Sequence, residues 1–116
     1  MTDDRLRFLK GTLDVLILKT LSWGPAHGYA ISRWIRQSSD DDLKLEEGAL
    51  YPALRRLEER GWVASEWQTT ETGREARVYL LTPAGRTAVR AEIAQWKRYV
   101  TAFTRVLDAR PSGARV

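Results

Sequence analysis

Few side chains in this sequence belong to the types that carry out covalent chemistry. The 116 residues include no cysteine and a single histidine, so thiol nucleophiles, disulfides and cysteine-ligated zinc are excluded, and no histidine-rich metal site can form within one chain. The sequence also lacks a glycine-rich phosphate-binding loop and a recognisable pair of catalytic carboxylates. His27 is expected to make a local hydrogen bond. We therefore expect a protein that is not an enzyme and that requires no metal and no cofactor.

Arginine is the most abundant charged side chain in the sequence. Lysine and arginine number 19 against 15 acidic residues, and all but four of the cations are arginine. The planar guanidinium group suits phosphate oxygens and the edge of guanine. Residues 1–60 hold as many acidic as basic side chains, so the net charge of +4 arises in residues 61–116. This charge favours nucleic acid as a partner, although arginine enrichment also follows from genome composition.

The segment 46–60 combines arginines with a buried leucine stripe. Leu50, Leu54 and Leu57 recur at helical spacing, two glutamates favour a helix N-terminus at residues 46–47, and Gly61 is suited to end the helix. With Leu50 at the centre of the buried face, steps of about 100° define the outward face. The residues predicted to face outward are Gly48, Tyr51, Pro52, Arg55 and Glu59, with Arg56 at the flank.

This outward face has the chemistry of a helix that enters the major groove of DNA. Gly48 and Ala49 leave room for close approach, and Pro52 is tolerated because it lies in the first turn. Tyr51 offers its ring to thymine methyl groups or its hydroxyl to phosphate, and Arg55 reaches guanine or phosphate. Four glutamates nevertheless outnumber three arginines in residues 46–60, so affinity has to come largely from elsewhere or from a dimer. Glu58 and Glu59 are expected to form a solvated face paired with arginines.

A β-hairpin follows this helix and carries more cations. Residues 62–68 and 77–81 are rich in strand formers, and residues 69–75, with a glycine at 73, form the turn between them. Arg74 could enter a minor groove and Arg77 could hold the DNA backbone. An ordinary polar hairpin tip is the alternative, which Glu71 and Glu75 favour. Tyr29, at the start of an earlier helix, is equally suited to a phosphate contact and to core packing.

Two further helices precede these elements. Apolar spacing predicts a first helix from Leu6 to Leu21 and a second from His27 to Gln37, with Trp34 facing inward beside two isoleucines. The order helix, helix, helix, hairpin is that of a winged helix-turn-helix. The expected fold class is therefore mainly α (α+β), with a two-stranded wing. Residues 38–42 are expected to form a polar loop.

A long last helix is predicted to dimerise the protein. Thr82 and Pro83 are suited to begin it, and it extends to about Leu107. Its apolar residues alternate in steps of four and three, which is the pattern of a helix–helix seam. A small domain cannot bury this stripe along a helix of roughly 37 Å, so we expect a homodimer in which the first helix supplies a partner face. The seam residues are Val89, Ile93, Trp96, Val100, Phe103 and Leu107.

Several short motifs resemble the PadR family of bacterial transcriptional regulators. They are Leu9-Lys10-Gly11-Thr12-Leu13, His27-Gly28-Tyr29, the segment 47–54 (EGALYPAL), the segment 57–61 (LEERG) and the segment 81–85 (LTPAG). The resemblance covers about residues 6–107, and the single C-terminal helix is similar to that of the short subfamily. It implies a homodimeric repressor that binds double-stranded DNA at a pseudo-palindromic operator. It also implies that the last helix packs on the first helix of the other subunit, in some members around a small-molecule effector.

Trp96 lies in the middle of the seam and has two interpretations. The first is implied by the resemblance to a multidrug-binding branch of the family, in which a tryptophan from each subunit looks to sandwich a flat aromatic ligand. Phe8 and Tyr99 would be neighbours of such a site. Because tryptophan is also a large dimer anchor, we place packing ahead of effector binding.

The organisation expected from the sequence is a DNA-binding domain at residues 6–82 and a dimerisation helix at 83–107. Residues 1–5 and 108–116 are expected to be flexible tails. No signal segment and no membrane-spanning run occurs, so we expect a cytoplasmic, nucleoid-associated bacterial protein with no membrane partner. A winged-helix module that binds protein and not DNA is the alternative, and the acidic balance of the third helix is its support.

Overall fold

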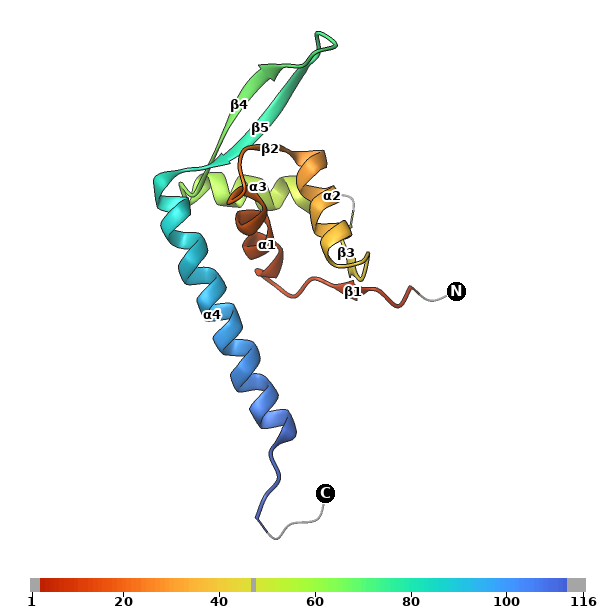
Figure 1. The fold of residues 1–116 in the computed structure, drawn as a ribbon, viewed down its shortest axis with the longest axis vertical. Helices are drawn as coiled ribbons and strands as arrows, with labels where there is room; N and C mark the ends of the chain where they lie inside the picture. The colour runs from red at the N-terminus through yellow and green to blue at the C-terminus, as the bar shows by residue number, and fades with distance from the viewer. Residues whose placement is uncertain (1–2, 47, 113–116) are drawn as a thin grey trace.

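A computed structural model describes residues 3–46 and 48–112 of the chain. Figure 1 shows a body made of three short helices and the base of a hairpin, with the hairpin projecting at one end and a long helix leaving the body toward the other. The predicted tails at residues 1–2 and 113–116 lie outside the described residues. The elements are β1 (Leu6–Arg7), α1 (Thr12–Leu21), β2 (Ala26–His27), α2 (Gly28–Ser38), β3 (Leu43–Lys44), α3 (Leu50–Glu59), β4 (Val63–Thr69), β5 (Glu75–Leu81) and α4 (Pro83–Asp108).

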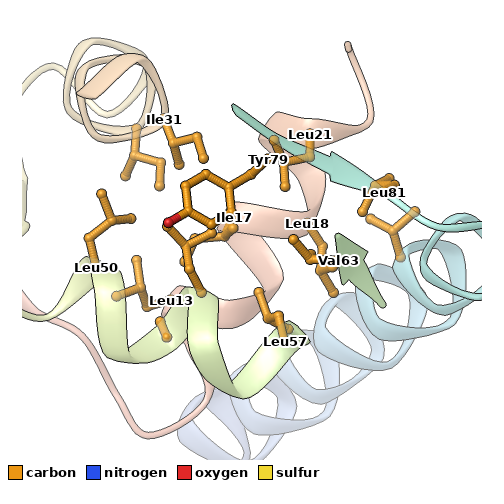
Figure 2. Close-up of a cluster of buried hydrophobic side chains, with 14 residues drawn as sticks. Leu13, Ile17, Leu18, Leu21, Ile31, Leu50, Leu57, Val63, Tyr79 and Leu81 are labelled. Atoms are coloured by element: carbon orange, nitrogen blue, oxygen red, sulfur yellow. The ribbon is translucent and has the colours of Figure 1, made fainter. Parts of the chain in front are cut away.

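Helix α1 lies at the centre of the body. It contacts α2, α3, α4 and β5, and its residues Ile17 and Leu18 have no exposed surface. Figure 2 shows these side chains surrounded by apolar residues of the other elements. The predicted start of this helix at Leu6 is wrong. The helix begins at Thr12, because Gly11 adopts a left-handed conformation with φ of 84° directly before it.

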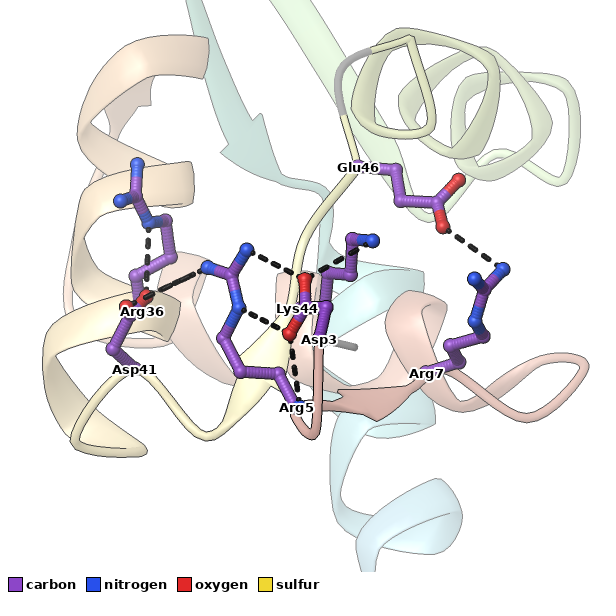
Figure 3. A network of polar contacts seen from close by, with 7 residues as sticks. All are labelled: Asp3, Arg5, Arg7, Arg36, Asp41, Lys44 and Glu46. Carbon is purple, nitrogen blue, oxygen red and sulfur yellow. Dashed lines mark hydrogen bonds and ion pairs between the residues drawn. The ribbon is translucent and has the colours of Figure 1, made fainter. Parts of the chain in front are cut away.

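The segment before α1 is extended and lies along the connection that leads to α3. Its strand β1 pairs in parallel with β3. Arg5 and Lys44 both hold the carboxylate of Asp3, at 2.9 and 3.1 Å, and Arg5 also reaches Asp41 at 3.4 Å (Figure 3). Hydrogen bonds from Arg5 and then from Lys44 hold the pKa of Asp3 well below its usual range. Residues 3–5, expected in a flexible tail, make these contacts, which position the segment more than they stabilise it because the charges are exposed.

Helix α2 follows β2 and packs on α1 and α3. Ile31 and Ile35 are buried as predicted, but the prediction that Trp34 faces inward is wrong, since 37% of its surface is exposed. Trp34 precedes Ile35 by one step of about 100° around the helix, which takes its side chain to the edge of the buried stripe. Strand β2 is too short to give a sequence pattern of its own, and the expected two-stranded sheet gains it as a third strand next to β5.

The hairpin has the register that places its base in the core. β4 and β5 pair antiparallel from Val63–Leu81 to Thr69–Glu75. Val63, Val78, Tyr79 and Leu81 at the base are buried, whereas most residues nearer the turn are exposed. The turn at residues 70–74 includes Gly73 with φ of 82°, a conformation that favours glycine. The predicted two-stranded wing is therefore confirmed, and we call β4, β5 and this turn the wing.

The start of α4 is fixed to the connection between α3 and β4. The Thr82 hydroxyl accepts a hydrogen bond from the Gly85 amide at 3.0 Å, which is the predicted N-cap, and donates one to the Gly61 carbonyl at 2.6 Å. The Thr82 amide donates to the Trp62 carbonyl at 3.1 Å. A Cβ atom on Gly85 would overlap that same carbonyl oxygen, so only glycine permits this approach.

The apolar seam of α4 is buried near its start and exposed farther along. Val89 is buried and Ile93 packs against the core. The exposed fractions then rise from 37% at Trp96 to 42% at Val100, 52% at Phe103 and 68% at Leu107. A single chain therefore covers only the first part of the predicted seam.

A buried carboxylate joins α1 to α3. Asp14 is 7% exposed and accepts a hydrogen bond from Arg56 at 2.9 Å. Asp14 also lies in the first turn of α1, where the helix dipole favours a negative charge. The arginine side chain is about half exposed, so the pair is intermediate between a buried and a surface ion pair.

We predict that Arg56→Ala lowers the free energy of unfolding by about 1–2 kcal/mol, because it leaves the Asp14 carboxylate buried without its partner. Arg55→Ala is the matched control, since Arg55 is exposed and makes no ion pair among the described residues. Urea unfolding of both variants measures the difference. Equal stabilities of the two variants would contradict a structural role for the Asp14–Arg56 pair.

Candidate nucleic-acid interface

Helix α3 has one buried and one exposed face, as its sequence predicts. Leu50, Leu54 and Leu57 are buried, and the outward side chains of Tyr51, Pro52, Arg55 and Glu59 are exposed. Gly61, with φ of 78°, follows the C-cap residue Arg60 and confirms the predicted end.

The start of α3 differs from the prediction. The helix begins at Leu50 and not at residues 46–47, since Gly48 adopts a left-handed conformation with φ of 89° before it. Gly48 is therefore part of the loop that leads into α3, and Ala49 is its half-buried N-cap residue. Glu47 lies outside the described residues. Gly48 and Ala49 therefore lie at the N-terminal end of α3, close in sequence to Tyr51.

The two neighbouring arginines of α3 have different surroundings. Arg56 is turned toward α1, and Asp14 raises the pKa of its guanidinium further above the ordinary value. Any contact from Arg56 to a phosphate would have to be shared with this carboxylate. Arg55 points to solvent at the edge of a cleft and is free of such a pair in the described part of the chain.

A cleft of about 690 Å³ separates α3 from the wing. It is lined by Tyr51, Arg55, Glu58, Glu59, Arg77 and Tyr79, and we call it the α3–wing cleft. The Arg77 side chain donates to the Ser65 hydroxyl at 2.9 Å and to the Glu58 carboxylate at 3.4 Å. Glu58 therefore faces the wing. The expected pairing with an arginine occurs, but the partner of Glu58 lies on β5 and not on α3. Burial raises the pKa of the Tyr79 hydroxyl.

Two aromatic rings lie close to the Arg77 guanidinium. The guanidinium lies 5.7 Å from the ring centre of Tyr79 and 6.0 Å from that of Trp67, within the range of cation–π attraction. Trp67 is 66% exposed, and it lies opposite Arg77 in the register of β4 and β5. Sequence reasoning missed Trp67, although its position directly across the hairpin from Arg77 follows from the strand register.

The tip of the wing presents Arg74 on an ordered turn. The Thr70 amide donates to the Arg74 carbonyl at 2.7 Å, and the Arg74 amide donates to the Thr70 hydroxyl at 3.2 Å. Within residues 3–46 and 48–112, no carboxylate lies within ion-pair distance of the Arg74 side chain. The Arg74 guanidinium is therefore available to an anion.

The start of α2 adds a further polar surface. Tyr29 is 74% exposed, so the alternative that it packs in the core is wrong. It lines a shallow cavity along α2 with Ser32 and Arg33, neither of which was singled out from the sequence. Their positions three and four residues after Tyr29 place them on one helix face, which is the signal that could have found them. His27 occupies the N-cap position of α2, but its side chain makes no capping hydrogen bond there.

The residues of the predicted effector site come together beside α4. An apolar cavity of about 380 Å³ lies between the start of α1 and α4, and it is lined by Phe8, Leu9, Leu16 and Trp96 among others. Tyr99 stacks on Trp96 with ring centres 5.9 Å apart. One face of Trp96 is therefore occupied within its own helix.

The described residues contain neither a cluster of metal ligands nor a membrane-spanning helix. In residues 3–46 and 48–112, no three metal-ligating side chains gather as a metal site would require. Over the same residues, no helix combines the length and apolar character needed to cross a membrane.

The chain is similar in sequence to a named transcriptional regulator and to an uncharacterized protein. It is 36% identical over 83 residues to the transcriptional regulator Rv3488 of Mycobacterium tuberculosis, a match that covers 71% of this chain and 73% of that protein. It is 44% identical over 78 residues to an uncharacterized 37.1 kDa protein in transposon TN4556 of Streptomyces fradiae. That match covers 67% of this chain and 21% of the longer protein, so the chain spans about a fifth of that relative.

The fold is similar to the folds of solved transcriptional regulators. A transcriptional regulator from Clostridium thermocellum is similar with a TM-score of 0.74 and 30% identity, over 83% of this chain and 90% of the other. A PadR family transcriptional regulator from Eggerthella lenta has a TM-score of 0.71 and 33% identity, over 87% and 86% of the two chains. Residues 17–91 match the transcriptional regulator PadR-like family. Because this match covers well over half of the chain, the protein belongs to the PadR-like family, whose members are transcriptional regulators and not enzymes.

Proposed function

We propose that the protein is a homodimeric, sequence-specific repressor of a pseudo-palindromic operator in double-stranded DNA. The observation that carries this proposal is the α3–wing cleft, which is lined by the exposed face of α3 and by Arg77 of the wing. With α3 in the major groove, the wing reaches the adjacent backbone and minor groove. The two recognition helices of a dimer then lie in successive major grooves, about 34 Å apart.

The exposed side chains divide into two proposed roles. Tyr51, Pro52 and Arg55 meet base edges, and Gly48 and Ala49 allow the close approach of the loop before α3. Arg77 and Tyr29 hold phosphates, and Arg74 reaches phosphate or a narrow minor groove. Arg56 supports α3 from its flank. Since α3 carries little net charge, most of the electrostatic affinity comes from the wing and from the second subunit.

We predict steeply salt-dependent binding to the operator. If a dimer neutralises about six to ten phosphates, the logarithm of the association constant falls with the logarithm of salt concentration with a slope of about −0.9 per phosphate. Arg74→Ala and Arg77→Ala each remove a cation from both subunits and should reduce the magnitude of the slope by about 2. Fluorescence anisotropy over a salt series on a duplex selected from a random pool measures the slopes.

Gln68→Ala, a neutral change at an exposed position of the same wing, is the control and should leave the slope unchanged. A flat salt response of the wild-type protein, or failure of the selection to yield a sequence, would favour the alternative function of a protein-interaction module. Repression itself is tested by a reporter gene placed behind the selected duplex.

The proposed dimer interface is the exposed part of the α4 seam, together with the start of α1. Trp96, Val100 and Phe103 form an apolar stripe that the single chain leaves open. The apolar cavity between α1 and α4 continues this stripe, so a helix from a second subunit would find apolar surface on both sides.

We predict that Val100→Asp yields a monomer, because a charge would be buried at the centre of the seam. Ala102→Asp is the matched control, since residue 102 is exposed and lies about 200° around the helix from residue 100. Sedimentation velocity at micromolar concentration separates the two species. A Val100→Asp protein that sediments like the wild-type dimer would rule out this seam as the interface.

The effector is a further part of the proposal. A small flat aromatic molecule fits the chemistry of the cavity beside Trp96, which is lined mainly by apolar side chains including Phe8. Tyr99 backs the indole on its other side. Packing of the partner helix against the same surface is the competing use of Trp96, and we place it first because aromatic residues on a seam are usually core.

We predict that planar aromatic molecules quench the tryptophan fluorescence of the dimer and that Trp96→Ala removes this response while the dimer persists. The other four tryptophans remain in that variant, and Trp23→Ala, which removes an exposed indole at the far end of α1, is the control. If a broad panel of ligands causes no quenching, or if the response survives in Trp96→Ala, Trp96 serves packing alone.

A further inference from the structure

We infer that Gly28 is a positioning residue for DNA recognition, because it provides the surface against which the Tyr51 side chain is seated. The inference rests on the proposed function, in which Tyr51 meets base edges. Gly28 is the first residue of α2, and Tyr51 lies in the first turn of α3. The contact therefore joins the starts of the two helices that form the helix-turn-helix.

The requirement for glycine at this position is steric. A Cβ atom on Gly28 would lie 2.8 Å from the hydroxyl oxygen of Tyr51 and 3.1 Å from two of its ring carbons. These three atoms are the nearest neighbours of that Cβ, and all belong to one side chain. The backbone of Gly28 does not adopt a left-handed conformation, unlike that of Gly11 or Gly48. The backbone conformation at position 28 is therefore open to other residues, and it is the Tyr51 side chain that favours glycine there.

Gly28 itself cannot move away from Tyr51. It is buried, and strand β2 directly before it pairs with β5 at Ala26–Tyr79 and His27–Val78. On its other side, α2 is fixed in the core by Ile31. Tyr51 is 59% exposed, and the atom that a new Cβ would approach most closely is the far end of its side chain. An added methyl group would therefore displace Tyr51 outward and leave the fold intact.

The consequence for recognition concerns the position of the tyrosine hydroxyl. An exposed tyrosine samples several rotamers, and ordering it on DNA costs free energy. The close approach to Gly28 fixes one side of the ring before DNA is bound, in a position on the edge of the α3–wing cleft. Displacing the ring would weaken base discrimination, whereas phosphate contacts made by the wing would be unchanged.

The test is a double-mutant cycle on Gly28→Ala and Tyr51→Ala, with binding to the selected operator and to an unrelated duplex of equal length. We expect Gly28→Ala to weaken operator binding by about three- to tenfold, part of the loss typical of a base contact, and to change unrelated-DNA binding less than about twofold. In the Tyr51→Ala background, Gly28→Ala should have no further effect. The melting temperature of the Gly28→Ala single variant should equal or exceed that of wild type, since alanine favours a helix more than glycine does.

Ala30→Ser is the control, because it adds one atom to an exposed position of the same helix turn. Operator binding by Tyr51→Ala that matches wild type would refute the proposed role of Tyr51, and with it the basis of the inference. If Tyr51→Ala weakens binding, three results overturn the inference alone. They are unchanged operator binding by Gly28→Ala, an equal loss in the presence and absence of Tyr51, and a failure of Gly28→Ala to fold.

Discussion

The burial of α1 is the constraint on which the rest of the structure depends. Its apolar side chains are covered by α2, α3, β5 and α4, so a single helix fixes the relative positions of α3, the wing and α4. Full burial of each leucine or isoleucine contributes about 1.5–3 kcal/mol. The Asp14–Arg56 pair adds a directional contact between α1 and α3, and this contact fixes the rotation of α3 about its axis, which nonpolar packing specifies less strictly.

The same arrangement distributes the arginines between internal and external partners. Arg56 is held by Asp14 and Arg77 by Glu58, whereas Arg55 and Arg74 have no carboxylate within ion-pair distance among residues 3–46 and 48–112. A phosphate that approaches Arg77 has to compete with a carboxylate already in place, so the gain from this contact is smaller than for a free arginine. In the proposed complex with DNA, Glu58 would therefore lower the general attraction for DNA and increase the relative weight of contacts that depend on sequence.

Much of the fold follows from the sequence because its long elements have clear periods. The leucine spacing of α3, the strand-forming residues of the hairpin and the Thr82–Pro83 start of α4 are local signals, and each predicts the element observed. The errors have a common physical cause. Leu6 and Leu9 fit a helical period, but the left-handed Gly11 and the pairing with β3 make the segment extended. Strand β2, the Glu58–Arg77 pair and the seat of Tyr51 on Gly28 are contacts between distant segments, which periodicity cannot indicate.

In the proposed dimer, the connection at the start of α4 links the dimer interface to the surface proposed to bind DNA. The Thr82 hydroxyl donates to the carbonyl of Gly61, which follows the C-cap of α3, and the Thr82 amide donates to the carbonyl of Trp62, directly before β4. Gly85 lets the α4 backbone approach that same point. A rigid helix of 26 residues then extends from this junction, about 39 Å at 1.5 Å per residue. A small rotation at the junction would be amplified along such a lever, so the hydrogen bonds of Thr82 and the absence of a side chain at Gly85 set the distance between the recognition helices in the proposed dimer.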